Sequence, residues 1–204
     1  MLFNDTYQSI EKKSTGIFKD RGSKFLAFIF PVKTETEIKE ILNSIRKEHH
    51  IANHHCYAWR LGADKLAFRS NDDGEPSNTA GKPILGQIQS NDLTDVLIVV
   101  ARYFGGTLLG VSGLINAYRE AAADAIKNSQ IIEKYVQFEY ETSFTFEHTN
   151  AVMKILKNAE AKIISQNYDS NCIIKFYIRK SLSENAEQQL KKIPVININY
   201  LKTM

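Results

Sequence analysis

Apolar residues gather into runs along this chain, and two of these runs predict buried strands. Residues 24–32 are apolar and aromatic up to Pro31, and residues 94–104 are apolar at nearly every position. A strand without polar alternation is covered on both faces, so the second run predicts the centre of a sheet. Residues 55–61 and 66–69 predict a strand pair around a short turn.

Helical spacing predicts three helices in the same part of the chain. The first has one apolar face, which is made by Ile38, Ile41, Leu42 and Ile45. Thr34, followed three residues later by Glu37, has the pattern of a capping box at its start. Residues 79–89 predict a short helix. The alanine-rich segment GLINAYREAAADAIKN predicts a longer one, which we expect Ser112 to cap.

The pattern changes near Tyr135, where polar and apolar residues begin to alternate. From there the sequence predicts strand, helix, strand, strand, helix and strand, in this order, at 135–146, 148–157, 161–168, 172–179, 182–192 and 195–201. A β-α-β-β-α-β order is the ferredoxin-like pattern. The predicted fold class is α+β, with one domain at 1–130 and a second at 134–204.

The composition is that of an ordinary folded protein, with 43% hydrophobic and 24% charged residues. The net charge of +3 is a mild basic balance that neither requires nor excludes a nucleic-acid partner. Cys56 and Cys172 fit no metal or redox spacing, and two free thiols predict a reducing compartment. Neither a signal peptide nor a membrane span is predicted. We therefore expect a cytoplasmic protein with no cofactor and no membrane partner.

The segment 71–113 concentrates turn residues, carboxylates and glycines, and such loops are the first place to look for a site. Gly105 and Gly110 have the spacing of a phosphate-binding loop, but Val111 stands where that loop needs a lysine. A glycine turn before a helix still offers N–H groups and a positive dipole end to an anion. The alternative is a plain tight turn. The candidate binding residues in this region are Arg102, Tyr103, Gly105, Gly106, Gly110 and Ser112.

Three carboxylates, on Asp72, Asp73 and Glu75, lie within four residues around a glycine. Carboxylates so close together perform acid–base chemistry or bind Mg²⁺. The alternative is an Asx-type turn in which the first side chains accept local N–H groups and the glycine supplies a positive φ. Ser77 and Thr79 are further candidate binding residues, which capping of the next helix also explains.

Four histidines and a cysteine crowd into residues 49–56. His50 and His54 are spaced so that a helix would present both on one side, as zinc ligands require. No HExxH or CxxC motif accompanies them, and we assign no metal. Alternatively, histidines at a helix end complement its dipole, and His54 reaches the acidic turn or a ligand phosphate.

Aromatic and basic residues alternate along the predicted strand pair. Tyr57 and Trp59 share one strand face, and Ala58 and Arg60 share the other. Aromatic rings beside arginines stack single-stranded bases in some sheets, which makes Arg60 a candidate nucleic-acid ligand. The alternative is that the rings fill the core.

Three segments carry a family resemblance: HIANHHCYAWR at 50–60, DDGEPSNTAGKPIL at 72–85 and RYFGG at 102–106. They are similar to the IMPACT family, in its bacterial YigZ-type branch, and the resemblance covers the whole chain. It implies a first domain with the fold of ribosomal protein S5 domain 2. It also implies a second, ferredoxin-like domain similar to those at the C-terminal end of elongation factor G. Asn78 departs from the small residue, such as glycine, that we expect there.

The resemblance leads us to expect a non-catalytic protein that regulates translation by binding RNA or a ribosome-associated partner. Eukaryotic relatives block a starvation-responsive initiation-factor kinase through an additional N-terminal domain, so that role is not carried over. The alternative is a hydrolase-like enzyme for a small phosphorylated or peptidic substrate, with the catalytic residues His54, Asp72, Asp73 and Glu75. A protein-interaction module without an RNA role is a third hypothesis. The second domain would add another contact or a homodimer interface.

Overall fold

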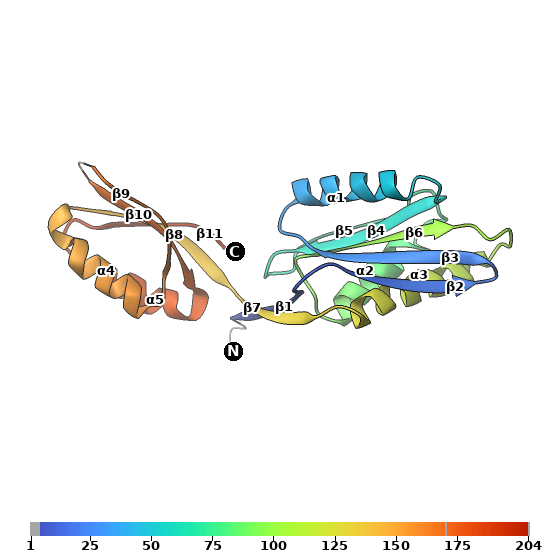
Figure 1. Cartoon of the computed structure of the whole chain (residues 1–204). Helices are drawn as coiled ribbons and strands as arrows, with labels where there is room; N and C mark the ends of the chain where they lie inside the picture. Colours follow the sequence, from blue (N-terminus) through green and yellow to red (C-terminus); the bar gives the residue numbers. More distant parts are fainter. Residues whose placement is uncertain (1–4, 170, 204) are drawn as a thin grey trace. The chain divides into compact units, whose positions relative to one another are not determined.

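The computed structural model of this protein describes residues 5–169 and 171–203 and divides the chain into two compact units (Figure 1). Residues 7–134 form the first unit. The segment from Tyr135 onward forms the second, together with Asp5 and Thr6.

The first unit is built on a five-stranded antiparallel sheet with the strand order β2-β3-β6-β4-β5. In that order the strands are Ser14–Asp20, Ser23–Pro31, Val96–Tyr103, His54–Leu61 and Ala67–Asn71. The central strand β6 is buried along both faces, which confirms the prediction from its nearly continuous apolar run. A separate two-stranded sheet pairs β1 (Thr6–Ile10) with β7 (Ile131–Tyr135).

Helices cover both faces of the five-stranded sheet (Figure 1). Helix α1 (Glu35–Glu48) packs on one face, and α2 (Gly81–Ser90) and α3 (Gly110–Lys127) pack on the other. Successive residues of β4 point to opposite faces, so Trp59 belongs to the core under α1 and Cys56 to the core under α2 and α3. The aromatic residues of β4 are therefore core residues.

The starts of two helices differ from the prediction. Thr34 caps α1 as expected, accepting the N–H of Glu37 at 3.2 Å. Helix α3, however, begins at Gly110 with Leu109 in the cap position, so the prediction that Ser112 caps it is wrong. The reason is that the two residues before Ser112 already have helical backbone bonding, which places its hydroxyl inside the first turn.

The second unit has the predicted order β8-α4-β9-β10-α5-β11. Its elements are Gln137–Phe144, Thr149–Asn158, Lys162–Tyr168, Cys172–Arg179, Lys180–Leu190 and Asn197–Thr203, with a short 3₁₀ turn at Phe146–His148. The four strands form an antiparallel sheet in the order β11-β8-β10-β9. Both helices lie on one face of this sheet (Figure 1) and enclose its core.

Candidate functional site

Asp72 begins the acidic turn directly after β5 and reaches the next helix. Its Oδ1 accepts the N–H groups of Ala80 at 3.0 Å and Gly81 at 2.8 Å, and its Oδ2 accepts that of Asn78 at 2.9 Å. Gly81 is the first residue of α2, so this carboxylate satisfies the helix N-terminus and complements its dipole. Capping by Thr79 is a wrong prediction, because that hydroxyl donates to a carbonyl within the turn at 2.6 Å.

Asp73 joins the turn to β4. Its N–H donates to Asn71 Oδ1 at 2.9 Å, and Gly74 follows with a φ of +89°, which confirms the Asx-type turn. The Asp73 Oδ2 accepts the N–H of His55 at 2.7 Å. The Asp73 carbonyl lies 2.8 Å from His54 Nδ1, and because a carbonyl only accepts, this nitrogen carries the proton. His54 therefore does reach the acidic turn.

Glu75 forms a buried ion pair. Its Oε1 accepts Arg102 Nη1 at 2.6 Å and the Tyr118 hydroxyl at 2.7 Å. The side chains of Glu75 and Arg102 are only 4% and 6% exposed, so each buried charge has the opposite charge as its partner. The Arg102 guanidinium also lies near the rings of Phe25 and Phe104, at 5.4 and 5.6 Å from their centroids. His54 Nε2 lies 3.9 Å from Glu75 Oε1.

Cys56 and Tyr118 extend this network into the core. The Cys56 thiol lies 3.0 Å from the Asp72 carbonyl and 3.3 Å from the Tyr118 hydroxyl. Burial raises the pKa of the Cys56 thiol and the pKa of the Tyr118 phenol above their ordinary values. Both groups are therefore protonated hydrogen-bond donors, and Cys56 is not a thiolate nucleophile.

A groove of about 440 Å³ lies beside this ion pair. It is bounded by His54, Glu75 and Arg102 on one side and by the loop from Leu108 to the first turn of α3 on the other. That loop contributes Leu108, Leu109, Gly110 and Val111, and the remaining lining residues are Asn53, Pro76, Phe104 and Leu114. The acidic turn at 72–75 and the loop at 104–110, which we call the glycine loop, therefore meet at one groove, which we call the α3 groove.

The glycine loop is held by backbone packing at its base. A Cβ on Gly105 would lie 1.9 Å from the carbonyl carbon of Gly22, so only glycine fits at this crossing of two turns. The Gly105 N–H also donates to Ser23 Oγ at 3.2 Å. Beyond this anchor, Leu108 and Val111 are 81% and 60% exposed and form an apolar rim of the groove.

Some predicted binding residues lie outside the α3 groove. Arg60 bonds to the carbonyls of Lys65 and Leu93. It lies six positions along β4 from His54, roughly 20 Å at the usual rise of a strand. Tyr103 points to the opposite sheet face, where its hydroxyl lies 2.7 Å from His49 Nδ1.

Apart from Arg102, only Gly110 of the other predicted binding residues lines the groove among the described residues. Ser77 is exposed in the turn, and Ser112 is exposed in the first turn of α3. Gly105 and Gly106 belong to the loop, whereas Gly110 does line the groove. Seven of the described residues that line the groove were not predicted as site residues: Asn53, Pro76, Phe104, Leu108, Leu109, Val111 and Leu114. Asn53 gives no signal in the sequence. Tyr118, which lies behind the groove in the Glu75 network, was missed as well, although it stands on the buried stripe of α3, where a hydroxyl needs a partner.

The histidines do not form a metal cluster. His50 follows α1 in a turn and His54 stands on β4, so the helical spacing that would make them neighbours is absent. Among residues 5–169 and 171–203, no group of three or more histidine, cysteine or acidic side chains is arranged to hold a metal ion. Cys56 and Cys172 are both free and buried. No helix in the described part of the chain is long and apolar enough to cross a membrane.

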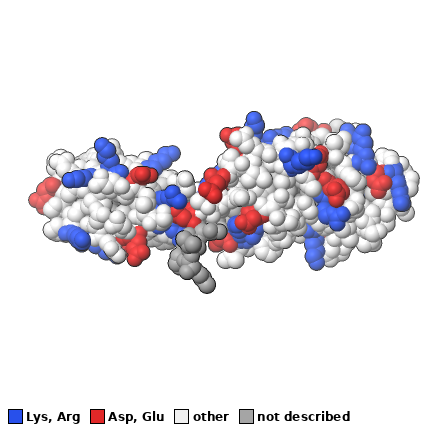
Figure 2. Space-filling model, turned by 90° about the horizontal axis from the view of Figure 1, so that it is seen from below, with Lys and Arg blue, Asp and Glu red and all other residues white. Residues whose placement is uncertain are grey.

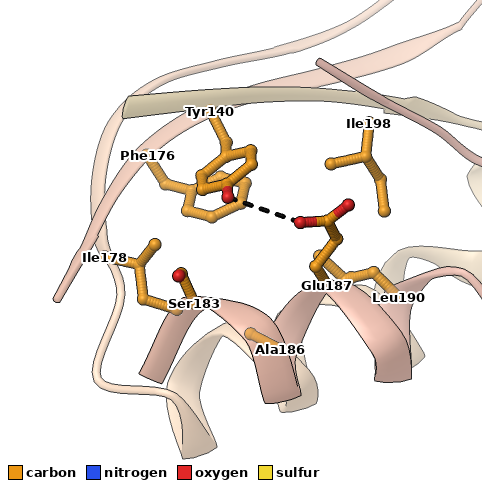
Figure 3. Close-up of a pocket in the computed structure, with 8 residues that line it drawn as sticks. All are labelled: Tyr140, Phe176, Ile178, Ser183, Ala186, Glu187, Leu190 and Ile198. Atoms are coloured by element: carbon orange, nitrogen blue, oxygen red, sulfur yellow. Dashed lines mark hydrogen bonds between the residues drawn. The ribbon is translucent and has the colours of Figure 1, made fainter. Parts of the chain in front are cut away.

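Charges of both signs are mixed on the face seen in Figure 2, and a second pocket lies in the core of the second unit. Figure 2 shows Lys and Arg side chains interspersed with Asp and Glu on the face of each unit that it presents. Figure 3 shows a pocket of the second unit, where the Tyr140 hydroxyl lies 3.4 Å from Glu187 Oε2. The side chains around it, such as Phe176 and Leu190, are 1% exposed, so it is a gap in the core.

Comparison with known proteins identifies the family. The Impact N-terminal domain matches residues 21–126. The IMPACT family member YvyE of Bacillus subtilis is 32% identical over 78% of this chain and 73% of its own length. The IMPACT family member YigZ of Escherichia coli is 32% identical over 76% of this chain and 77% of its own.

A solved structure described as a hypothetical protein has the same fold. It is 26% identical, with a TM-score of 0.77 over 97% of this chain and 98% of that one. The Saccharomyces cerevisiae protein described as an IMPACT homolog is 38% identical, over 45% of this chain. The family match at 21–126 includes the residues that line the α3 groove. The chain belongs to the IMPACT family.

Proposed function

We propose that this protein is a non-catalytic cytoplasmic protein that regulates translation by binding a ribosome-associated protein in the α3 groove. One observation carries the proposal: the carboxylates expected to do chemistry are engaged by the fold. Asp72 holds the start of α2, Asp73 holds β4, and Glu75 is paired with a buried arginine. What is left at the surface is a groove with an apolar rim, which suits binding better than acid–base chemistry.

A protein partner is favoured over RNA by the character of this rim. Phe104, Leu108 and Val111 are all large, apolar and at least 45% exposed, and they border the same groove. Among the described residues that line the groove, Arg102 is the single arginine, and its Nη1 is paired with Glu75. Nucleic-acid sites depend instead on unneutralised Lys and Arg that contact phosphates.

Two finer fold assignments are part of this proposal. We assign the second unit to the ferredoxin-like domains, similar to those of elongation factor G, and the order β11-β8-β10-β9 with both helices on one face supports this assignment. We assign the first unit to the fold of ribosomal protein S5 domain 2. The second unit would provide a further contact with the same assembly or an interface between two copies.

Sedimentation with purified ribosomes through a sucrose gradient tests this function. We expect the protein in the ribosomal fractions, and we expect Val111→Glu to reduce that amount about tenfold by placing a charge on the apolar rim. Leu66→Glu is the matched control, because Leu66 is also exposed but lies outside the groove. Absence of the wild-type protein from the ribosomal fractions would contradict the proposal.

Salt distinguishes the two classes of partner in the same experiment. Binding through an apolar groove should change little between about 50 and 200 mM salt. A protein that makes 6–10 phosphate contacts would lose roughly 10³–10⁵ in affinity over that range. A loss of that size would show that RNA, and not a protein, is bound.

A further inference from the structure

The N-terminus of α3 differs from an ordinary helix start because it opens into the α3 groove. The first N–H groups of any α-helix lack partners within the helix and carry the positive end of its dipole. Leu109, in the cap position, makes no side-chain hydrogen bond to them. Gly110 and Val111 at this start both line the groove. The groove therefore has an end that favours a negative charge.

A second observation at the same place also indicates a missing acceptor. Arg102 is 5% exposed and lines the groove, and its Nε has no hydrogen-bond partner within the described part of the chain. Buried donors are almost always paired, and a guanidinium has enough N–H groups to serve two acceptors. Glu75 takes Nη1 and leaves Nε for another acceptor. Nε is itself buried, so an acceptor reaches it only if a neighbouring side chain, such as the half-exposed Phe104 beside the guanidinium, moves.

The rest of the groove is apolar. Leu109 and Leu114 form its buried wall, and Leu108 and Val111 form its exposed rim. A ligand that fits must hold a carboxylate and an apolar group close together. The last residue of a polypeptide does so, since one Cα carries both its side chain and the free carboxylate.

We propose that the α3 groove binds the C-terminus of a partner protein that ends in an apolar residue such as leucine. The terminal carboxylate lies at the start of α3 and accepts from Arg102 Nε, and the apolar side chain packs against Leu109 and Leu114. This inference rests on the proposed function, because it names the chemistry of the partner that the same groove would bind. It differs from a phosphate site in requiring the apolar group as well as the charge.

The probes are two acetylated tetrapeptides of sequence Gly-Ser-Gly-Leu, one with a free C-terminal carboxylate and one with a C-terminal amide. Titration into ¹⁵N-labelled full-length protein follows the backbone amide signals at 110–113. We expect saturable shifts there with the carboxylate peptide. The amide peptide should bind about tenfold more weakly, since it lacks the charge-assisted hydrogen bonds. Equal affinities for the two peptides, or no binding of either, would overturn the inference.

Two substitutions at one exposed position separate the charge from the apolar contact. Val111→Glu places a negative charge beside the proposed carboxylate and should abolish the preference for the acid peptide. The matched variant Val111→Gln removes the same methyl groups without a charge and should keep the preference. An acidic residue in the first turn suits a helix, so Val111→Glu should remain folded, and the spread of its amide signals checks this. A preference that persists in folded Val111→Glu would overturn the inference.

Ribosome sedimentation keeps this inference distinct from the proposed function. If the protein sediments with ribosomes but shows no preference for the free carboxylate, the inference fails and the proposed function stands. If the preference is seen but no ribosome binding, the function fails and the carboxylate site stands. A single-stranded oligouridylate that shifts the signals at 110–113 while the acid peptide does not would overturn the inference in favour of RNA.

Discussion

Helices α2 and α3 lie side by side on one face of the same sheet, but their N-termini are treated in opposite ways. The start of α2 receives a carboxylate from Asp72, which lies nine residues before its first residue, Gly81. The start of α3 has no side-chain cap and opens into a groove. One helix start is therefore capped by a side chain of the fold, and the other has no such cap and borders a groove. The acidic turn serves both, because Glu75 holds Arg102 beside α3.

The largest expected effect comes from breaking the ion pair beside α3. Glu75→Ala leaves the buried Arg102 charge without its partner, so the free energy of unfolding should fall by about 3–5 kcal/mol. Urea unfolding measures this. The double variant Glu75→Leu with Arg102→Met replaces both charges by apolar groups and should recover most of the loss. A loss below about 1 kcal/mol in Glu75→Ala would mean that the pair is not buried in solution.

The next effect is expected at the capped helix. Asp72→Ala removes a carboxylate that accepts three backbone N–H groups at the start of α2, and should cost about 2–3 kcal/mol. The midpoint of urea unfolding checks this. Glu40→Ala, on the exposed surface of α1, is the control and should stay within about 0.5 kcal/mol. Equal midpoints for the two variants would remove the distinction between the helix starts.

The smallest effect is expected at Ser112, in the first turn of α3. A capping serine contributes about 1 kcal/mol, whereas Ser112→Ala should change the free energy of unfolding by less than about 0.5 kcal/mol. Thermal unfolding, with Thr34→Ala in α1 as the true-cap control, measures the difference. If Ser112→Ala were as destabilising as Thr34→Ala, the α3 start would be capped after all.

Local patterns in the sequence were enough to predict most of the elements. The nearly continuous apolar run of β6 predicted the central strand. The alternation of Tyr57 and Trp59 along β4 predicted which residues share a sheet face. Strand β2 was not predicted, because its most buried position is Gly16 and its apolar Ile17 faces outward, which conceals the alternation. Strands β1 and β7 were missed as well, since five-residue strands give little periodicity.

The site depended on contacts that local patterns do not contain. The contact between His54 and the acidic turn could be predicted, because His54 begins β4 and the acidic turn follows the end of β5, the neighbouring strand. The Glu75 carboxylate, however, finds Arg102 27 residues away and Tyr118 43 residues away. These pairings depend on strand order and on where α3 crosses the sheet. Strand order also separates Arg60 from Arg102, although both are arginines in predicted strands. Arg102 pairs with His54 at the start of β4, whereas Arg60 lies near the end of β4.

The close backbone contact between Gly22 and Gly105 restricts which substitutions can accumulate in the evolution of this protein. A side chain at either glycine would need the other turn to move, so the two positions are constrained as a pair although 83 residues separate them. Any relative with a larger residue at 105 should also carry a longer or differently shaped turn between its second and third strands. Changes at Leu108 and Val111 meet no such constraint. The loop can therefore change its outer residues without changing its base.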